Sequence, residues 1–169
     1  MKALVVILVS GVVALASAAP VLASGDPLAS GRVRTATGYA AGFRAAYMPV
    51  VTTLHGVSAA CPEADTVQEL PACAARVAPF RAALAGVLAY VTHTAPPAAA
   101  KADVQTLAAS TRALQRVFAT SATLLRQKNL ARLKAMGGLG HPIDNAINAF
   151  VSAVGSVIVD IPGLRLPLP

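Results

Sequence analysis

Apolar residues recur at every third or fourth position in four long segments of this chain, which is the spacing of one face of an α-helix. The first segment covers residues 35–56, and the second begins between Thr66 and Pro71. The third is the longest, and the fourth lies between Pro142 and Pro162. Because alternating runs of β-branched residues are missing, the pattern favours helices over strands throughout.

Four amphipathic helices with short connections bury their apolar faces most simply by packing against one another. We therefore predict an all-α fold, an antiparallel four-helix bundle that spans residues 35–161. The third apolar stripe loses its phase after Arg126, which indicates a kink or an extra short helix that begins near residues 127–129. A flexible leader at 24–34 and an extended tail at 162–169 complete the predicted organisation.

Local signals predict where individual helices begin or bend. Thr66 and Glu69 have the spacing of a capping box, and Asp144 falls in the first turn of the last helix, where the helix dipole favours a negative charge. Pro49 and Pro79 lie inside predicted helices, and a proline there cannot donate the usual backbone hydrogen bond. We therefore expect a kink or a break at Pro49 and a kink at Pro79.

The N-terminal residues follow the order of a secretory signal peptide. Lys2 precedes an apolar run at 3–15, and the small residues at 16–18 suit a signal peptidase. We predict a signal peptide at 1–18, with a cut after residue 23 as the alternative. An uncleaved anchor is disfavoured because the run is shorter than the roughly 20 residues of a membrane-spanning helix. The mature protein is therefore predicted to be secreted or to reside in the cell wall or periplasm.

Basic residues outnumber acidic ones, with 14 Lys and Arg against 7 Asp and Glu and a formal net charge of +7. This excess favours anionic partners such as wall polymers, lipid headgroups or acidic proteins. Nucleic acid is a poor fit, because an exported chain with few aromatic residues offers bases little to stack on. Six residues are the candidates for binding an anionic surface: Arg112, Arg116, Arg126, Lys128, Arg132 and Lys134. The alternative is an ordinary solvated helix face.

The two cysteines, Cys61 and Cys73, lie near the two ends of the connection between the first two helices. An even number of cysteines in an exported chain indicates a disulfide. A redox pair is the alternative, but the spacing is not that of a C-x-x-C motif. We predict a structural disulfide between Cys61 and Cys73.

The residues that catalysis or metal binding would need are scattered. His55, His93 and His141 are far apart, with no acidic residue at ligand spacing, so no metal site is predicted. A nucleophile elbow and a glycine-rich phosphate loop are also missing, so we expect no enzyme activity and no cofactor. Tyr90 and His93 are one helical turn apart, which leaves a haem or another apolar ligand between the helices as an alternative.

Small residues are predicted to face outward on two of the helices. On the second helix they are Ala74, Ala78, Ala82, Ala85 and Ala89, and on the last helix Ala146, Ala149, Ser152, Ala153 and Ser156. Such faces permit close approach by a protein, another helix or a hydrophobic material. Alanine is also the best helix former, so the same residues are explained by helix propensity alone.

Residues 102–161, about a third of the chain, resemble the second half of fungal hydrophobic-surface-binding proteins of the A type. The likeness lies in Ala-Thr-Leu-Leu-Arg-Gln-Lys at 122–128, the small-residue loop with Gly137 and Gly138, and the apolar helix at 143–151. The resemblance implies a small secreted helical protein that adsorbs to hydrophobic surfaces or to the cell wall without catalysis.

Together these features predict an exported helical bundle that acts by binding, most simply to a cell surface or wall. Two other functions stay open at this point. One is a carrier of an apolar ligand or haem inside the bundle. The other is a secreted inhibitor or effector that docks on a protein partner through the loop between the two cysteines.

Overall fold

The computed structural model describes residues 35–61, 66–137 and 141–167. Five helices follow one another in these residues, and no strand occurs among them: α1 (Ala36–Ala60), α2 (Leu70–His93), α3 (Lys101–Arg126), α4 (Leu130–Met136) and α5 (Pro142–Asp160). The predicted all-α fold class is confirmed. The predicted signal peptide at 1–18, its alternative end at residue 23 and the leader at 24–34 lie outside the described residues.

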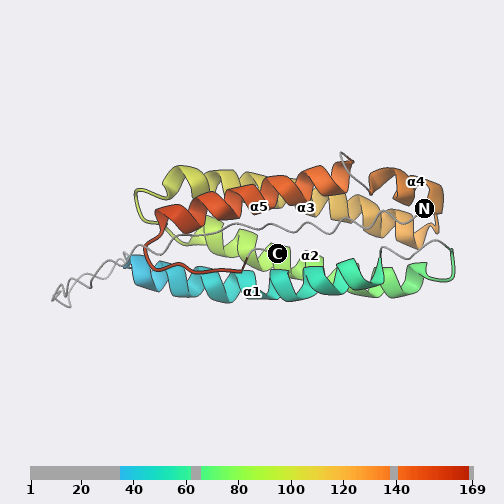
Figure 1. Cartoon of the computed structure of the whole chain (residues 1–169), viewed down its shortest axis with the longest axis horizontal. Helices are drawn as coiled ribbons and strands as arrows, with labels where there is room; N and C mark the ends of the chain where they lie inside the picture. Colours follow the sequence, from blue (N-terminus) through green and yellow to red (C-terminus); the bar gives the residue numbers. More distant parts are fainter. Residues whose placement is uncertain (1–34, 62–65, 138–140, 168–169) are drawn as a thin grey trace. The chain divides into compact units, whose positions relative to one another are not determined.

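The four long helices run alternately in opposite directions (Figure 1). Helix α1 packs on α2, α2 packs on α3, and α3 packs on α5, while the short α4 packs on α3. Each long helix therefore lies against the next long helix in the sequence, as the short connections predict. Helix α1 continues to Ala60, past the predicted end near Gly56, because Val57 still packs in the core.

Side chains near the starts of α1 and α2 satisfy backbone donors that have no partner inside the helix. The Thr35 hydroxyl accepts a hydrogen bond from the Gly38 amide at 3.2 Å. The Glu69 carboxylate accepts one from the Thr66 amide at 2.8 Å, which is one half of the predicted capping box. The other half does not form, since no cap bond to a side chain is found at the start of α2.

Neither internal proline ends its helix, so no break occurs at Pro49 or at Pro79. Both prolines are exposed, and so are Ala45 and Ala75, whose carbonyls lose their usual partner. These carbonyls can bind water instead, which lowers the cost of keeping proline inside a helix.

The break between α3 and α4 confirms the loss of phase in the sequence. Lys128 has a φ of 53°, in the left-handed region, and Asn129 follows as the cap of α4. The Asn129 side-chain oxygen accepts a hydrogen bond from the Arg132 amide at 3.1 Å. The chain therefore changes direction within 127–129, and Leu130 and Leu133 still pack against the core.

Aromatic side chains form much of the contact between the long helices. The Phe80 and Phe118 rings join α2 to α3 edge to face, with centroids 4.7 Å apart. The Tyr47 and Phe150 rings join α1 to α5 at 6.3 Å. All four side chains are buried, so they fix how the helices lie against one another as well as filling the core.

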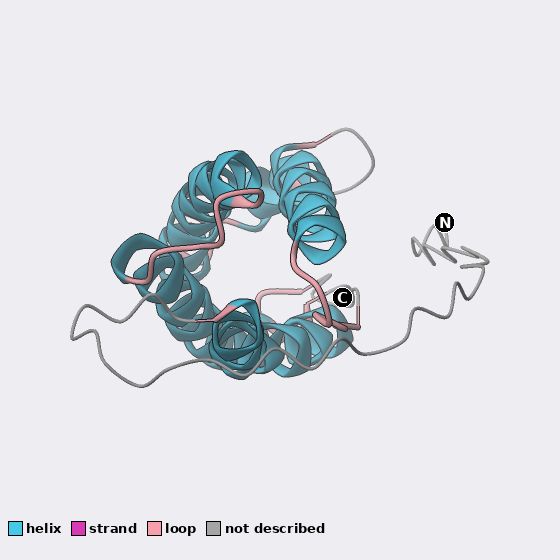
Figure 2. Cartoon of the chain, turned by 90° about the vertical axis from the view of Figure 1, so that its left-hand side faces the viewer, coloured by secondary structure: helices cyan, strands magenta, loops and turns pink. Residues whose placement is uncertain are grey.

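The described C-terminal residues, 161–167, contain no helix or strand and pack on the bundle. Ile161 and Leu164 are buried, and Gly163 makes the turn between them with a φ of 78°. The Tyr47 hydroxyl donates a hydrogen bond to the Pro167 carbonyl at 3.2 Å. Figure 2 shows this loop passing from the end of α5 to α1. The tail therefore covers the side of the core between α1 and α5.

The buried hydroxyls of Tyr39 and Tyr47 differ in whether they have a hydrogen-bond acceptor. We therefore expect their removal to change the free energy of unfolding in opposite directions. Burial raises the pKa of both phenols, so both stay neutral at physiological pH. Tyr47 has the Pro167 carbonyl as its acceptor, whereas the buried Tyr39 hydroxyl has no hydrogen-bond partner in the described part of the chain.

Tyr39→Phe should therefore raise the free energy of unfolding by about 1 kcal/mol, because it removes a buried unpaired hydroxyl. Tyr47→Phe should lower it by about 1 kcal/mol, because it removes a hydrogen bond. Urea denaturation followed by circular dichroism measures both. Equal losses in the two variants would show that the Tyr39 hydroxyl is paired in solution.

Candidate anion-binding groove

A groove of about 620 Å³ lies between α2 and α3. Three of the residues that line it are arginines, Arg81 from α2 and Arg112 and Arg116 from α3. Gln115, Ala85 and Ala119 complete the lining. The groove therefore has cationic groups on both helices and small side chains between them.

The positions of these arginines follow from the packing of the two helices. Arg112 and Arg116 are four residues apart and so lie on one side of α3, away from its buried stripe. Arg81 directly follows Phe80, whose ring packs on the Phe118 ring of α3. This contact sets the alignment of α2 along α3 and brings Arg81 level with the two arginines of α3.

The groove carries positive charge that no acidic side chain among the described residues offsets. None of its lining residues is acidic, and the described carboxylates form no ion pair with Arg81, Arg112 or Arg116. The Arg116 Nε donates a long hydrogen bond, 3.4 Å, to the Arg112 carbonyl, which holds its side chain along the helix. Three guanidinium groups that repel one another are stabilised by a bound anion.

The six basic residues proposed from the sequence do not form one site. Arg112 and Arg116 line the groove, and Arg81, which the sequence analysis did not single out, joins them. The other four are exposed near the turn between α3 and α4 and do not line it: Arg126, Lys128, Arg132 and Lys134. The only sequence signal for Arg81 is its place at the edge of the apolar stripe of α2.

Tyr90 and His93, the pair considered for haem or an apolar ligand, have different surroundings. The Tyr90 hydroxyl donates a hydrogen bond to the Tyr39 carbonyl at 2.8 Å, and its ring packs against the rings of Tyr39 and Phe43. His93 is exposed at the end of α2. The two side chains therefore do not meet at one place in the core.

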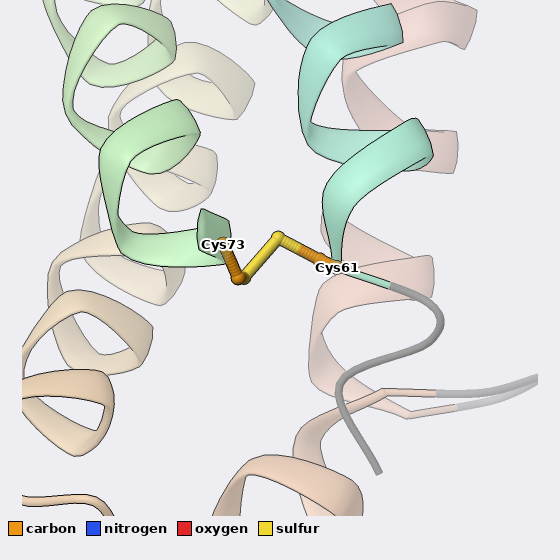
Figure 3. The surroundings of a disulfide bond; sticks show 2 residues. All are labelled: Cys61 and Cys73. Atoms are coloured by element: carbon orange, nitrogen blue, oxygen red, sulfur yellow. A yellow bond between two sulfur atoms is a disulfide. The ribbon is translucent and has the colours of Figure 1, made fainter. Parts of the chain in front are cut away.

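Cys61 and Cys73 form the predicted disulfide, which joins the end of α1 to the first turns of α2 (Figure 3). Their sulfur atoms are 2.07 Å apart and their Cα atoms 4.7 Å apart. Cys73 is buried and Cys61 half-buried against the core. The inhibitor or effector hypothesis depends on the loop between them, of which residues 62–65 lie outside the described residues. Among the described residues, no group of three metal-ligating side chains occurs.

The outward alanine faces are present on α2 but only in part on α5. On α2, Ala78, Ala82, Ala85 and Ala89 are exposed, and Ala74 is half-buried. On α5, Ala149, Ser152 and Ser156 are exposed, but Ala146 and Ala153 are buried. The prediction was wrong for these two because their side of α5 packs against the rest of the bundle.

By length and composition alone, α2 and α5 could each cross a membrane. In the bundle, 28% of the most apolar window of each helix is buried.

Two carboxyl groups meet where the start of α3 lies beside the end of α5. The Asp160 carboxyl, by a hydrogen bond and then by its charge, raises the pKa of Asp103 above its ordinary value of 3.8. A raised pKa means that the folded state holds this proton more tightly than the unfolded state does. The pair therefore destabilises the fold at pH values above the raised pKa, and this cost disappears below about pH 3.8.

Asp160→Asn should raise the melting temperature by about 1–2 °C at pH 7, because it removes the repulsion between Asp160 and Asp103. It also removes a negative charge from the C-terminal end of α5, where the helix dipole disfavours one. The gain should disappear as the pH falls below 4. Thermal melts of the variant and the parent protein at pH 7 and pH 3.5 measure both effects. A gain that is equal at the two pH values would contradict the role of the carboxyl pair.

Comparisons of the chain with protein-family models, with curated proteins and with solved structures find no match. The resemblance of residues 102–161 to the fungal surface-binding proteins therefore stays a prediction.

Proposed function

We propose that this protein is exported and binds an anionic extracellular surface, such as a wall or matrix polymer, without catalysing a reaction. The observation that carries the proposal is the groove between α2 and α3, where Arg81, Arg112 and Arg116 gather with no acidic neighbour in the lining. Anionic polymers are the partners that such a site attracts most strongly, because the weak ion contacts of many charged groups add along the polymer.

The chemistry of the lining supports binding over catalysis. Arginine stays protonated at any physiological pH, so it cannot act as a general base, and alanine and glutamine supply no nucleophile. A bound anion would be held and oriented, with no group beside it to attack it or to move a proton.

The four basic residues near the α3–α4 turn support the same function. Arg126, Lys128, Arg132 and Lys134 are all exposed, and Arg126 lies on the same side of α3 as Arg112 and Arg116. A polymer bound in the groove could therefore continue along α3 and meet further positive charge.

Adsorption to a hydrophobic surface is the second candidate. It is favoured by α2, which is apolar enough to cross a membrane. The face of α2 that is exposed in the bundle consists largely of alanine. Adsorption of this kind would be insensitive to salt, whereas binding through the arginine groove weakens as salt screens the charges. Salt dependence therefore separates the two candidates.

The proposal is tested by expressing the 169-residue chain in a secreting host and recovering it from the medium. N-terminal sequencing should find a start at Ala19 or Ser24. The protein should be retained on immobilised heparin at about 0.15 M salt and released at about 1 M, because the screening length falls from about 8 to 3 Å. Failure to bind heparin or another polyanion, or an uncleaved chain that stays in the cells, would overturn the proposal.

A further inference from the structure

We infer that the arginine groove recognises phosphate or sulfate ester groups on an extended polysaccharide. This inference rests on the proposed function and names the ligand class of the same site. It is drawn from the type of cation in the groove, from its small uncharged residues, and from the row of charge that continues along α3.

The cations that line the groove are all arginines. A guanidinium group is planar and presents paired N–H donors, which match two oxygens of a phosphate or sulfate group at once. Arg81 lines the groove from α2, and Arg112 and Arg116 line it from α3, so a bound anion can meet guanidinium donors from two sides. A tetrahedral anion can accept hydrogen bonds from several directions, whereas a carboxylate presents only two oxygens in one plane.

The uncharged part of the lining fits a sugar ring. Ala85 and Ala119 leave room between the arginines, and Gln115 offers both a donor and an acceptor to sugar hydroxyls. A nucleic acid fits less well, because the protein's Phe and Tyr side chains all lie in the described helices and none is exposed for stacking on bases.

A membrane surface also fits less well than a polysaccharide. Val67 and Val159 are the only large hydrophobic side chains exposed in the described part of the chain, and neither lines the groove. Peripheral helices that bind bilayers insert leucine, phenylalanine or tryptophan below the headgroups. A hydrated polymer chain needs no such anchor, because it can lie in the groove with its charged groups against the arginines.

The spacing of the exposed arginines along α3 indicates how long the ligand should be. Arg126 is exposed on the same side of α3 as Arg112 and Arg116, about 15 Å beyond Arg116 along the helix axis. A chain with several ester groups can therefore occupy the groove and reach Arg126 at the same time. Affinity should rise with oligosaccharide length until this distance is spanned.

The test uses isothermal titration calorimetry of the secreted protein with four probes. These are a heparin-derived octasaccharide, the same oligosaccharide after desulfation, an oligogalacturonate of similar length, and vesicles that contain phosphatidylserine. The sulfated octasaccharide should bind at least about 10-fold more tightly than either carboxylate oligomer, because only its sulfate esters engage the guanidinium groups from several sides.

Variants separate the groove from general positive charge. Arg81→Gln, Arg112→Gln and Arg116→Gln together should weaken binding of the octasaccharide by about 30-fold or more. The matched control changes three exposed arginines outside the groove lining, Arg44→Gln, Arg76→Gln and Arg165→Gln, and should weaken it less than about 3-fold. Lysine at the three groove positions keeps the charge, and a loss of about 5-fold or more would support recognition by guanidinium geometry.

The outcomes distinguish this inference from the proposed function. Equal losses in the groove variant and the control would leave binding to anionic surfaces intact but overturn the groove as its site. Equal affinity for the sulfated and carboxylate oligomers, or tighter binding to the vesicles, would overturn the ligand class. Failure of every anionic probe would overturn the proposed function itself. Circular dichroism of each variant checks that these exposed substitutions leave the helices folded.

Discussion

Replacing both Cys61 and Cys73 with alanine should lower the free energy of unfolding by about 3 kcal/mol. The two cysteines are 12 positions apart, and their bond closes the loop between α1 and α2. Without the bond, the unfolded chain regains the conformational freedom of that loop, so folding costs more entropy. The melting temperature should fall by about 6–12 °C. Urea denaturation and thermal melts of the variant and the parent protein measure the two quantities.

Reduction provides an independent check on the same bond. A reducing agent should shift the parent protein to the stability of the double variant and should leave the variant itself unchanged. Far-ultraviolet circular dichroism should still show a helical protein below the new melting temperature, because the helix contacts of α3 and α5 do not involve the disulfide. A loss below about 1 kcal/mol would contradict the loop-entropy argument.

Gly42→Ala should lower the free energy of unfolding by about 2 kcal/mol, although alanine forms helices better than glycine. A Cβ atom at this position would lie 2.6 Å from the Tyr90 hydroxyl oxygen and 2.7 Å from Cε2 of the same ring. The ring would have to move away from α1, and Tyr90 would lose its hydrogen bond to the Tyr39 carbonyl. Urea denaturation measures the change.

Gly86→Ala is the matched control for this substitution. Gly86 lies inside α2, and a Cβ atom there would meet no atom within 4 Å. Its replacement should raise the free energy of unfolding by up to about 1 kcal/mol through helix propensity alone. In a double-mutant cycle, Tyr90→Ala should remove most of the cost of Gly42→Ala, because the clashing ring is gone. If the two changes add independently, the contact with Tyr90 is not the cause.

The disulfide and the contact between Gly42 and Tyr90 differ in whether the sequence alone could predict them. The disulfide could be predicted because Cys61 and Cys73 are the only cysteines and lie at the two ends of one short connection. The contact of Gly42 with Tyr90 joins residues of two helices, and nothing in either segment indicates it. Gly42 read by itself is only a weak point in a helix.

The arginines of the candidate groove could likewise be predicted only in part from the sequence. Arg112 and Arg116 could be predicted as a pair because a helix places residues four apart on one side. Arg81 could not be added to them, because its position depends on how α2 slides along α3, and the buried Phe80 and Phe118 rings set that alignment. Of the six basic residues singled out in the sequence, only Arg112 and Arg116 line the groove, because the other four lie farther along the chain, near the turn between α3 and α4.

Burial on α5 also needed the tertiary structure. Ala146 and Ala153 lie at the edge of its apolar stripe, and a small side chain at such an edge is compatible with either solvent or a neighbouring helix. The packing of the tail could not be predicted, because the burial of Leu164 and the hydrogen bond from Tyr47 to Pro167 join residues far apart in the sequence.

The amino-acid sequence by itself determined the helical class, the places where helices begin and the break at 127–129, because each depends on residues within one or two turns. Tertiary structure alone decided which arginines share a groove, which alanines are buried and where the tail lies. Those features depend on the alignment of whole helices, and that alignment is set by the shapes of interlocking side chains from distant parts of the chain.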